Sequence, residues 1–173
     1  MNLFKSNLLK IVGIIAIALF TVGCKKENMN IIPNVPVYIE LDLVTDLAPL
    51  GVGQAVTIKP DTVNTEYSIV DYHSKKFPKT SIPWQTYNNG VLLYRPEFNK
   101  YLAFDMTCTY NPFVDDCSIQ IVNLDFIPVC KCCKSVFNLV SGGFPMDSSK
   151  AKKALVQYNV TIVNGGTRLV ISK

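Results

Sequence analysis

The segment "LVQYNVTIVNGGTRLVIS", residues 155–172, decides the fold class of this chain. Both of its halves are short and rich in β-branched and aromatic residues, a composition that is typical of strands. The Asn-Gly-Gly at residues 164–166 lies between them and is a turn signal, because these residues tolerate the backbone angles of tight hairpin turns. The segment therefore predicts a β-hairpin.

The same texture extends over the rest of the chain from residue 37. Residues 37–43, "VYIELDL", alternate apolar and polar residues, which is the period of a half-buried strand. Further strands are expected at residues 54–58, 67–70, 91–95, 101–107, 118–124 and 135–140. No segment has a sustained helical period, although residues 149–155 could form one helical turn. We therefore expect an all-β domain, a small sandwich or barrel.

The N-terminus carries a targeting signal. Lys5 and Lys10 form a positive region, and residues 11–23 form an apolar run of 13 residues. That run is too short for a bilayer core of about 30 Å but matches a secretory signal peptide. The following "TVGC", residues 21–24, resembles a bacterial lipobox, which implies that Cys24 is lipidated. An ordinary cleaved signal with Cys24 free is the alternative.

These features predict the organisation of the chain and its location. Residues 1–23 are a lipoprotein signal peptide, residues 24–36 are the lipidated cysteine and a tether, and residues 37–173 are one β domain. The domain is expected outside the cytoplasm, anchored to a bacterial membrane by lipid, where disulfides persist. The formal net charge is only +4 and no basic stripe contains interleaved aromatics, so we expect no nucleic-acid partner.

Five cysteines fall in two loops that join neighbouring predicted strands. Cys108 and Cys117 lie in the first of these loops. The second contains "VCKCCKSVF", residues 129–137, with Cys130, Cys132 and Cys133. Cys132 and Cys133 cannot easily bond each other, because adjacent side chains on an extended backbone point apart. The two loops are expected to form a cysteine-rich site at one end of the domain.

This arrangement resembles the Rieske iron–sulfur domain. The Rieske pattern is Cys-x-His in one loop and Cys-x-x-His in the next, each after a strand; here the two boxes read "CTY", 108–110, and "CKCCKSVF", 130–137. The likeness covers residues 37–173 and is closest to lipid-anchored Rieske-like proteins of Bacteroidota. It implies a Rieske-like domain whose ancestral function is one-electron transfer through a two-iron two-sulfur cluster.

The resemblance also implies roles for single residues. The candidate cluster ligands are Cys108, Cys130, Cys133 and Tyr110, with Cys133 and Tyr110 standing where the family has its histidines. Both histidines are therefore absent from the two boxes.

Three further roles follow from the same pattern. Cys117 and Cys132 match the extra disulfide of high-potential Rieske proteins. Ser135 matches the serine that hydrogen-bonds cluster sulfur, and Lys134 occupies the position of the turn glycine.

His73, the chain's only histidine, is interpreted as a surface loop residue, Trp84 as a core or rim aromatic, and Asp115 and Asp116 as a solvated loop.

Three functions stay open at this point. The site could hold a modified two-iron two-sulfur cluster that transfers electrons. It could be a redox-silent, disulfide-stapled module that binds an envelope protein. It could also be a zinc site of Cys108, Cys117, Cys130 and Cys133. We predict a stapled remnant in which Cys108 bonds Cys130 or Cys133, because close thiols oxidise outside the cytoplasm. No catalytic residue set is found, so the expectation favours a non-catalytic or electron-transfer domain over an enzyme.

Overall fold

The computed structural model describes residues 32, 36–48, 50–61, 66–70, 89–110, 112, 117–122 and 126–173. Cys24, the signal peptide, His73, Trp84, Asp115 and Asp116 lie outside the described residues. In the part that is described, no helix is long and apolar enough to cross a membrane.

The described chain is nearly all β, as the sequence predicts. Its strands are β1 (Tyr38–Asp42), β2 (Ala55–Asp61), β3 (Glu66–Val70), β4 (Val91–Glu97), β5 (Lys100–Asp105), β6 (Ile119–Ile121), β7 (Pro128–Cys130), β8 (Phe137–Asn138), β9 (Phe144–Pro145), β10 (Gln157–Val163) and β11 (Arg168–Ser172).

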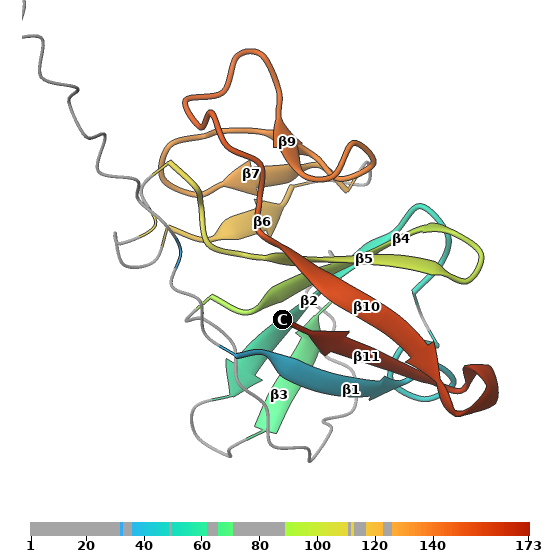
Figure 1. The fold of residues 1–173 in the computed structure, drawn as a ribbon. Coiled ribbons are helices and arrows are strands. Elements are labelled where there is room, and N and C mark those ends of the chain that lie inside the picture. The colour runs from blue at the N-terminus through green and yellow to red at the C-terminus, as the bar shows by residue number, and fades with distance from the viewer. Residues whose placement is uncertain are drawn as a thin grey trace, which may run out of the picture.

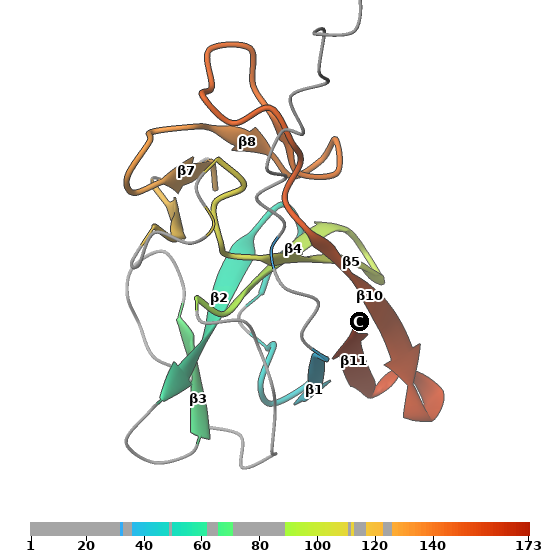
Figure 2. The ribbon, with the colours of Figure 1, turned by 60° about the vertical axis from the view of Figure 1, so that its left-hand side comes forward.

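Seven strands form one antiparallel sheet in the order β1-β11-β10-β5-β4-β2-β3. The sheet curls into a half-barrel, so that its edge strands β1 and β3 both lie at the bottom of the view (Figures 1 and 2). The short strands form two further pairs, β6 with β7 and β8 with β9. These pairs lie at the opposite end of the molecule, above β4 and β5 (Figure 1).

The predicted hairpin is confirmed. β10 pairs with β11 in antiparallel register, with Val163 opposite Arg168, and a short 3₁₀ turn, Asn164–Gly166, joins them. All three turn residues have positive φ, at 53°, 66° and 91°. Glycine adopts such angles without a steric penalty and asparagine tolerates them, which explains why this sequence turns here.

Two hydrophobic clusters stabilise the fold, and β4 and β5 contribute to both. Val91 and Leu93 pack in the cluster of the curled sheet, whereas Leu92 and Tyr94 pack in a second cluster under the short strands. The first four residues of β4 are consequently all buried, because alternate side chains face two different cores. The second cluster includes Cys108 and Cys130, so the cysteine site is built on the side of the sheet away from the first core.

The sequence prediction is wrong in detail at the cysteine end. Within the described residues 118–122 of one expected strand the structure has only β6, and the expected strand at 135–140 is reduced to β8, while β7 and β9 were not expected. The helical turn expected at 149–155 is absent. The Ser149 hydroxyl instead accepts the Val136 N–H at 2.9 Å and donates to the Val136 carbonyl at 2.8 Å. These bonds hold the segment against the loop that carries the cysteines.

Candidate metal centre

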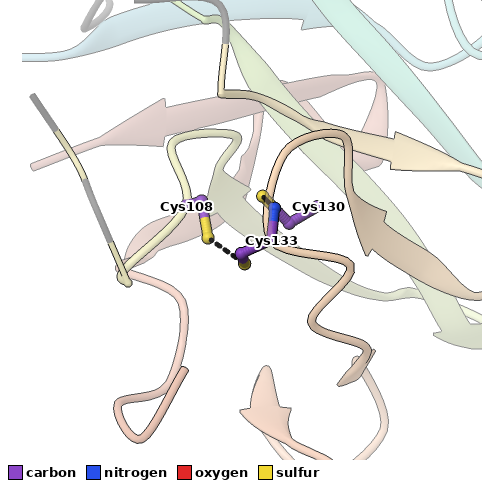
Figure 3. Close-up of side chains that lie close together, drawn as sticks. All are labelled: Cys108, Cys130 and Cys133. Atoms are coloured by element: carbon purple, nitrogen blue, oxygen red, sulfur yellow. Dashed lines mark hydrogen bonds between the residues drawn. The ribbon is translucent and has the colours of Figure 1, made fainter. Parts of the chain in front are cut away.

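Three cysteines from the two loops converge at one point. Their Sγ atoms all lie within 4.8 Å of one another, and those of Cys108 and Cys133 are 3.5 Å apart. Figure 3 shows the sulfur of Cys108 directed toward Cys133, with Cys130 beside them. The candidate ligands Cys108, Cys130 and Cys133 thus form a cluster that could hold a metal ion.

Cys108 is placed by the segment that follows β5. Its N–H donates to the Cys117 carbonyl at 3.2 Å, and the neighbouring Thr107 forms a β-bridge with Ser118. The buried Asp105 carboxylate accepts the Thr107 N–H at 2.7 Å and also the hydroxyl of Tyr158 on β10. The position of Cys108 is therefore tied both to the main sheet and to the start of β6.

Cys130 and Cys133 are oriented by one tight turn. The Cys130 N–H donates to the Ser135 carbonyl at 2.8 Å, and the Lys134 N–H donates to the Cys130 carbonyl at 3.1 Å. The Cys133 N–H also points at the Cys130 Sγ, at 3.5 Å. Lys134 completes the turn with a φ of 59°, an angle that glycine adopts more easily than lysine. The turn brings the two sulfur atoms to the same side.

Ser135 supports Cys133 from below the turn. Its hydroxyl oxygen is fully buried, accepts the Cys133 thiol at 3.0 Å and accepts the Ala151 N–H at 2.9 Å. Burial opposes ionisation of Cys133, but hydrogen bonds from the side chain and backbone of Ser135, and then from Cys130 and Cys108, outweigh it and lower its pKa. This agrees with the role near the site sulfur that the resemblance implies for Ser135.

The Cys108 thiol behaves in the opposite way. It is 1% exposed, and burial raises its pKa far above the usual range of a cysteine. Hydrogen bonds with the Cys130 and Cys133 thiols raise the pKa further, and a backbone hydrogen bond from Tyr110 opposes the rise. Without a bound cation the Cys108 sulfur therefore keeps its proton, whereas the Cys133 sulfur loses its proton more readily.

A disulfide joins the two loops beside this cluster. The sulfur atoms of Cys117 and Cys132 are bonded at 2.05 Å across a sequence separation of 15 residues. This is the pair that the resemblance implies. With Cys117 in this bond, the four-thiolate zinc set of Cys108, Cys117, Cys130 and Cys133 is not available in this structure.

One other expectation differs from the structure. Cys108, Cys130 and Cys133 are free thiols, so the expected second disulfide is not formed. The Tyr110 side chain is 43% exposed, and the contact of Tyr110 with Cys108 is through its backbone N–H.

The sequence reasoning missed three residues that build the site, namely Asp105, Ser149 and Tyr158. Their contribution is a hydrogen bond to a partner distant in sequence, 53 residues away for Tyr158 and Asp105. No local pattern encodes such a contact. The one available signal is Asp105 itself, a carboxylate directly after the apolar residues 102–104.

Comparisons with protein-family models, with curated proteins and with solved structures give no significant match.

Proposed function

We propose that this chain is a lipid-anchored cell-envelope protein with a Rieske-like domain, in which Cys108, Cys130 and Cys133 bind metal through their thiolates. The observation that carries this proposal is the approach of the three Sγ atoms to within 4.8 Å, from two loops separated in sequence. Thiolates are soft ligands that select zinc, Cu(I) and iron–sulfur clusters.

Three features support the likeness to Rieske domains. The three thiols that converge are three of the candidate cluster ligands. The bonded pair Cys117 and Cys132 corresponds to the family's disulfide. Lys134 has a φ of 59° at the position where the family has glycine. Cys133 and Tyr110 stand where the family has histidines, so we expect a metal centre that differs from the family's, because a thiolate adds the negative charge that imidazole lacks.

The envelope location rests on two independent features. The N-terminal 24 residues have the pattern of a lipoprotein signal. The Cys117–Cys132 disulfide is of a kind that persists outside the cytoplasm and is rare inside it. The membrane is then a partner through the lipid on Cys24, and an envelope redox or binding partner would approach the cysteine end.

A bound metal would supply a positive charge that keeps the thiolates from oxidising. Three close thiols beside a disulfide are otherwise prone to form a further disulfide in an oxidising compartment. The chain's own contribution is to fix the three sulfur atoms, through the Cys130–Ser135 backbone bond and the Cys108–Cys117 backbone bond. The second cluster buries Cys108 and Cys130 and keeps water from their sulfur atoms.

A redox-silent stapled module is the second candidate, and one distance favours it. The Sγ atoms of Cys108 and Cys133 lie 3.5 Å apart, so a small side-chain movement would bring them to bonding distance. This form would cross-link the same two loops without metal. The stapled module requires Cys108 and Cys133 to be oxidised to a disulfide, whereas the metal centre requires both to be reduced.

The two candidates are separated by the metal and thiol content of the full-length protein. The protein is extracted from membranes with detergent under anaerobic conditions, and its metals are measured together with its alkylatable thiols. We expect bound metal in the wild type and in the exposed control Val140→Ser, and loss of metal in Cys108→Ser and Cys133→Ser. Metal-free wild type with a Cys108–Cys133 disulfide would replace the metal centre with the stapled module.

A further inference from the structure

We propose that the site takes one soft monovalent ion, Cu(I), coordinated by the three thiolates of Cys108, Cys130 and Cys133. This inference rests on the proposed metal-thiolate function and names its metal. It contrasts with a two-iron cluster, which divides its ligands between two metal atoms.

The spacing of the sulfur atoms suits a single ion. A metal–sulfur bond of about 2.3 Å in a trigonal or tetrahedral site places the sulfur atoms about 3.8 to 4.0 Å apart. The sulfur atoms of Cys108 and Cys133 are 3.5 Å apart and no pair exceeds 4.8 Å, so small movements would bring all three separations into this range. Ligands on different irons of a cluster must be spread over the iron–iron separation as well. The three sulfur atoms therefore enclose room for one ion.

The number of donors favours Cu(I) over zinc and over a cluster. Among the histidine, cysteine, aspartate and glutamate side chains that the structure describes, the group of potential ligands consists of these three cysteines. Cys117 and Cys132, the nearest other cysteines in sequence, are bonded to each other. Structural zinc sites close with four ligands, and iron–sulfur clusters use four as well. Cu(I) is a soft closed-shell ion for which three thiolates complete the coordination.

Two of the sulfur atoms have a backbone hydrogen-bond donor, and the third lies beside a hydroxyl that can become one. The Cys133 N–H faces the Cys130 sulfur at 3.5 Å, and a backbone hydrogen bond from Tyr110 reaches the Cys108 sulfur. The Ser135 hydroxyl lies 3.0 Å from the Cys133 sulfur and accepts the thiol proton while that sulfur is neutral. One Cu(I) with three thiolates has a net charge of −2. Donors to ionised sulfur form strong, charge-assisted hydrogen bonds, and they compensate this charge in the buried site.

Binding of Cu(I) changes the protonation state of the three cysteines. Three neutral thiols release three protons when they bind one Cu(I), and no electron is transferred. Ser135 now accepts the Cys133 thiol proton, so after that proton leaves its hydroxyl turns to donate to the thiolate. The Ala151 N–H keeps its bond to the same oxygen in both states, and it fixes the position of the Ser135 side chain.

The test uses the full-length, detergent-solubilised protein with its disulfide intact, handled without oxygen. Cu(I) is titrated against a chromophoric Cu(I) chelator, and the loaded protein is measured by copper X-ray absorption. We expect one copper per chain, a shell of three sulfur atoms at about 2.3 Å and no second metal nearby. This measurement on the wild type needs no variant that might fail to fold.

Variants then assign the ligands. Cys108→Ser, Cys130→Ser and Cys133→Ser should each weaken Cu(I) binding by roughly 100-fold or more, and leave two sulfur atoms in the shell. Ser135→Ala should weaken it by roughly 10-fold and shift the thiolate-to-copper absorption, with Ser135→Thr restoring both. Val140→Ser, at an exposed position outside the site, should leave the affinity unchanged.

Four results would overturn the inference. Preference for zinc in a four-coordinate site would replace Cu(I) and leave the metal-thiolate function standing. Binding of about two irons with two sulfides per chain would do the same. Loss of copper in Tyr110→Phe would add a phenolate ligand and refute the three-thiolate site. Failure to bind Cu(I), zinc or iron while all three thiols remain alkylatable would refute both the ion and the proposed function.

Discussion

The two ends of this domain are stabilised in different ways. At the end formed by β1, β10 and β11, strands of five to seven residues pair in long ladders over an apolar core. At the cysteine end, β6 to β9 have only two or three residues each. A disulfide and buried hydroxyls replace the ladders there. A regular sheet thus carries a site whose geometry depends on a few specific bonds.

The largest effect is expected where the long ladders meet the core. Ile171 of β11 is fully buried and lies opposite Ile39 of β1. Ile171→Ala should lower the free energy of unfolding by about 4 kcal/mol, because it removes buried methyl groups and leaves a cavity. Denaturant unfolding measures this, and the half-buried neighbour Val170→Ala should cost under about 1.5 kcal/mol. Equal losses in the two variants would contradict the role given to the core.

The disulfide is the next most important element, and its effect should be confined to the other end. Replacing both Cys117 and Cys132 by serine opens a loop of 15 residues, which should cost about 3 kcal/mol. Native-state hydrogen exchange should show faster exchange in β6 and β7 with protection kept in β10 and β11. Uniform loss of protection over both ends would show that they unfold together and break the comparison.

A smaller effect is expected from the hydroxyl that holds residues 149–155 in place. Ser149→Ala leaves the Val136 N–H and carbonyl without their partner, which should cost about 2 kcal/mol. Ser148 is exposed, and Ser148→Ala serves as the matched control with little expected change. Thermal unfolding of the two variants compares them. An unchanged melting temperature for Ser149→Ala would mean that water replaces the hydroxyl.

The smallest effect on stability is expected from the positive φ angle of Lys134 in the cysteine turn. Lys134→Gly removes the strain of a φ of 59°, whereas the greater entropy of glycine in the unfolded chain offsets part of that gain. The net effect should be a stabilisation of about 0.5 kcal/mol. Asn99 has a φ of 60° in the β4–β5 turn, and Asn99→Gly should change stability less, because asparagine tolerates this region. Chemical denaturation of both variants measures the difference. Destabilisation by Lys134→Gly would indicate that the lysine side chain stabilises the turn.

The same contrast explains what could be predicted from the sequence. The strands and the hairpin could be predicted from the alternation in residues 37–43 and from the Asn-Gly-Gly turn, because side-chain period and turn chemistry are local properties of the sequence. The strands β7 and β9 were missed because two or three residues are too few to establish a period. Their existence depends on pairing with β6 and β8, which only the folded chain brings together.

At the site, the sequence predicts which cysteines lie together better than it predicts which of them are bonded to each other. The cysteines that converge follow from their places in two loops, and the pair Cys117 and Cys132 follows from the resemblance. Whether Cys108 and Cys133 bond depends on closing a sulfur–sulfur distance of 3.5 Å to the 2.05 Å seen in the Cys117–Cys132 bond, and a sequence does not specify such a distance. The hydrogen bond between Tyr158 and Asp105 depends on the register of β10 against β5, where Tyr158 lies opposite Ala103.

The position of the Cys117–Cys132 bond has a consequence for how the protein matures. Cys132 is flanked by Cys133 and, one residue further, by Cys130. If the chain is exported as we propose, its two cysteine loops present five thiols that can pair wrongly. An ion captured by Cys108, Cys130 and Cys133 before oxidation would act as a protecting group and leave one pair to oxidise. Metal supply during export would then determine the yield of correctly bonded protein, and metal starvation would appear as scrambled disulfides.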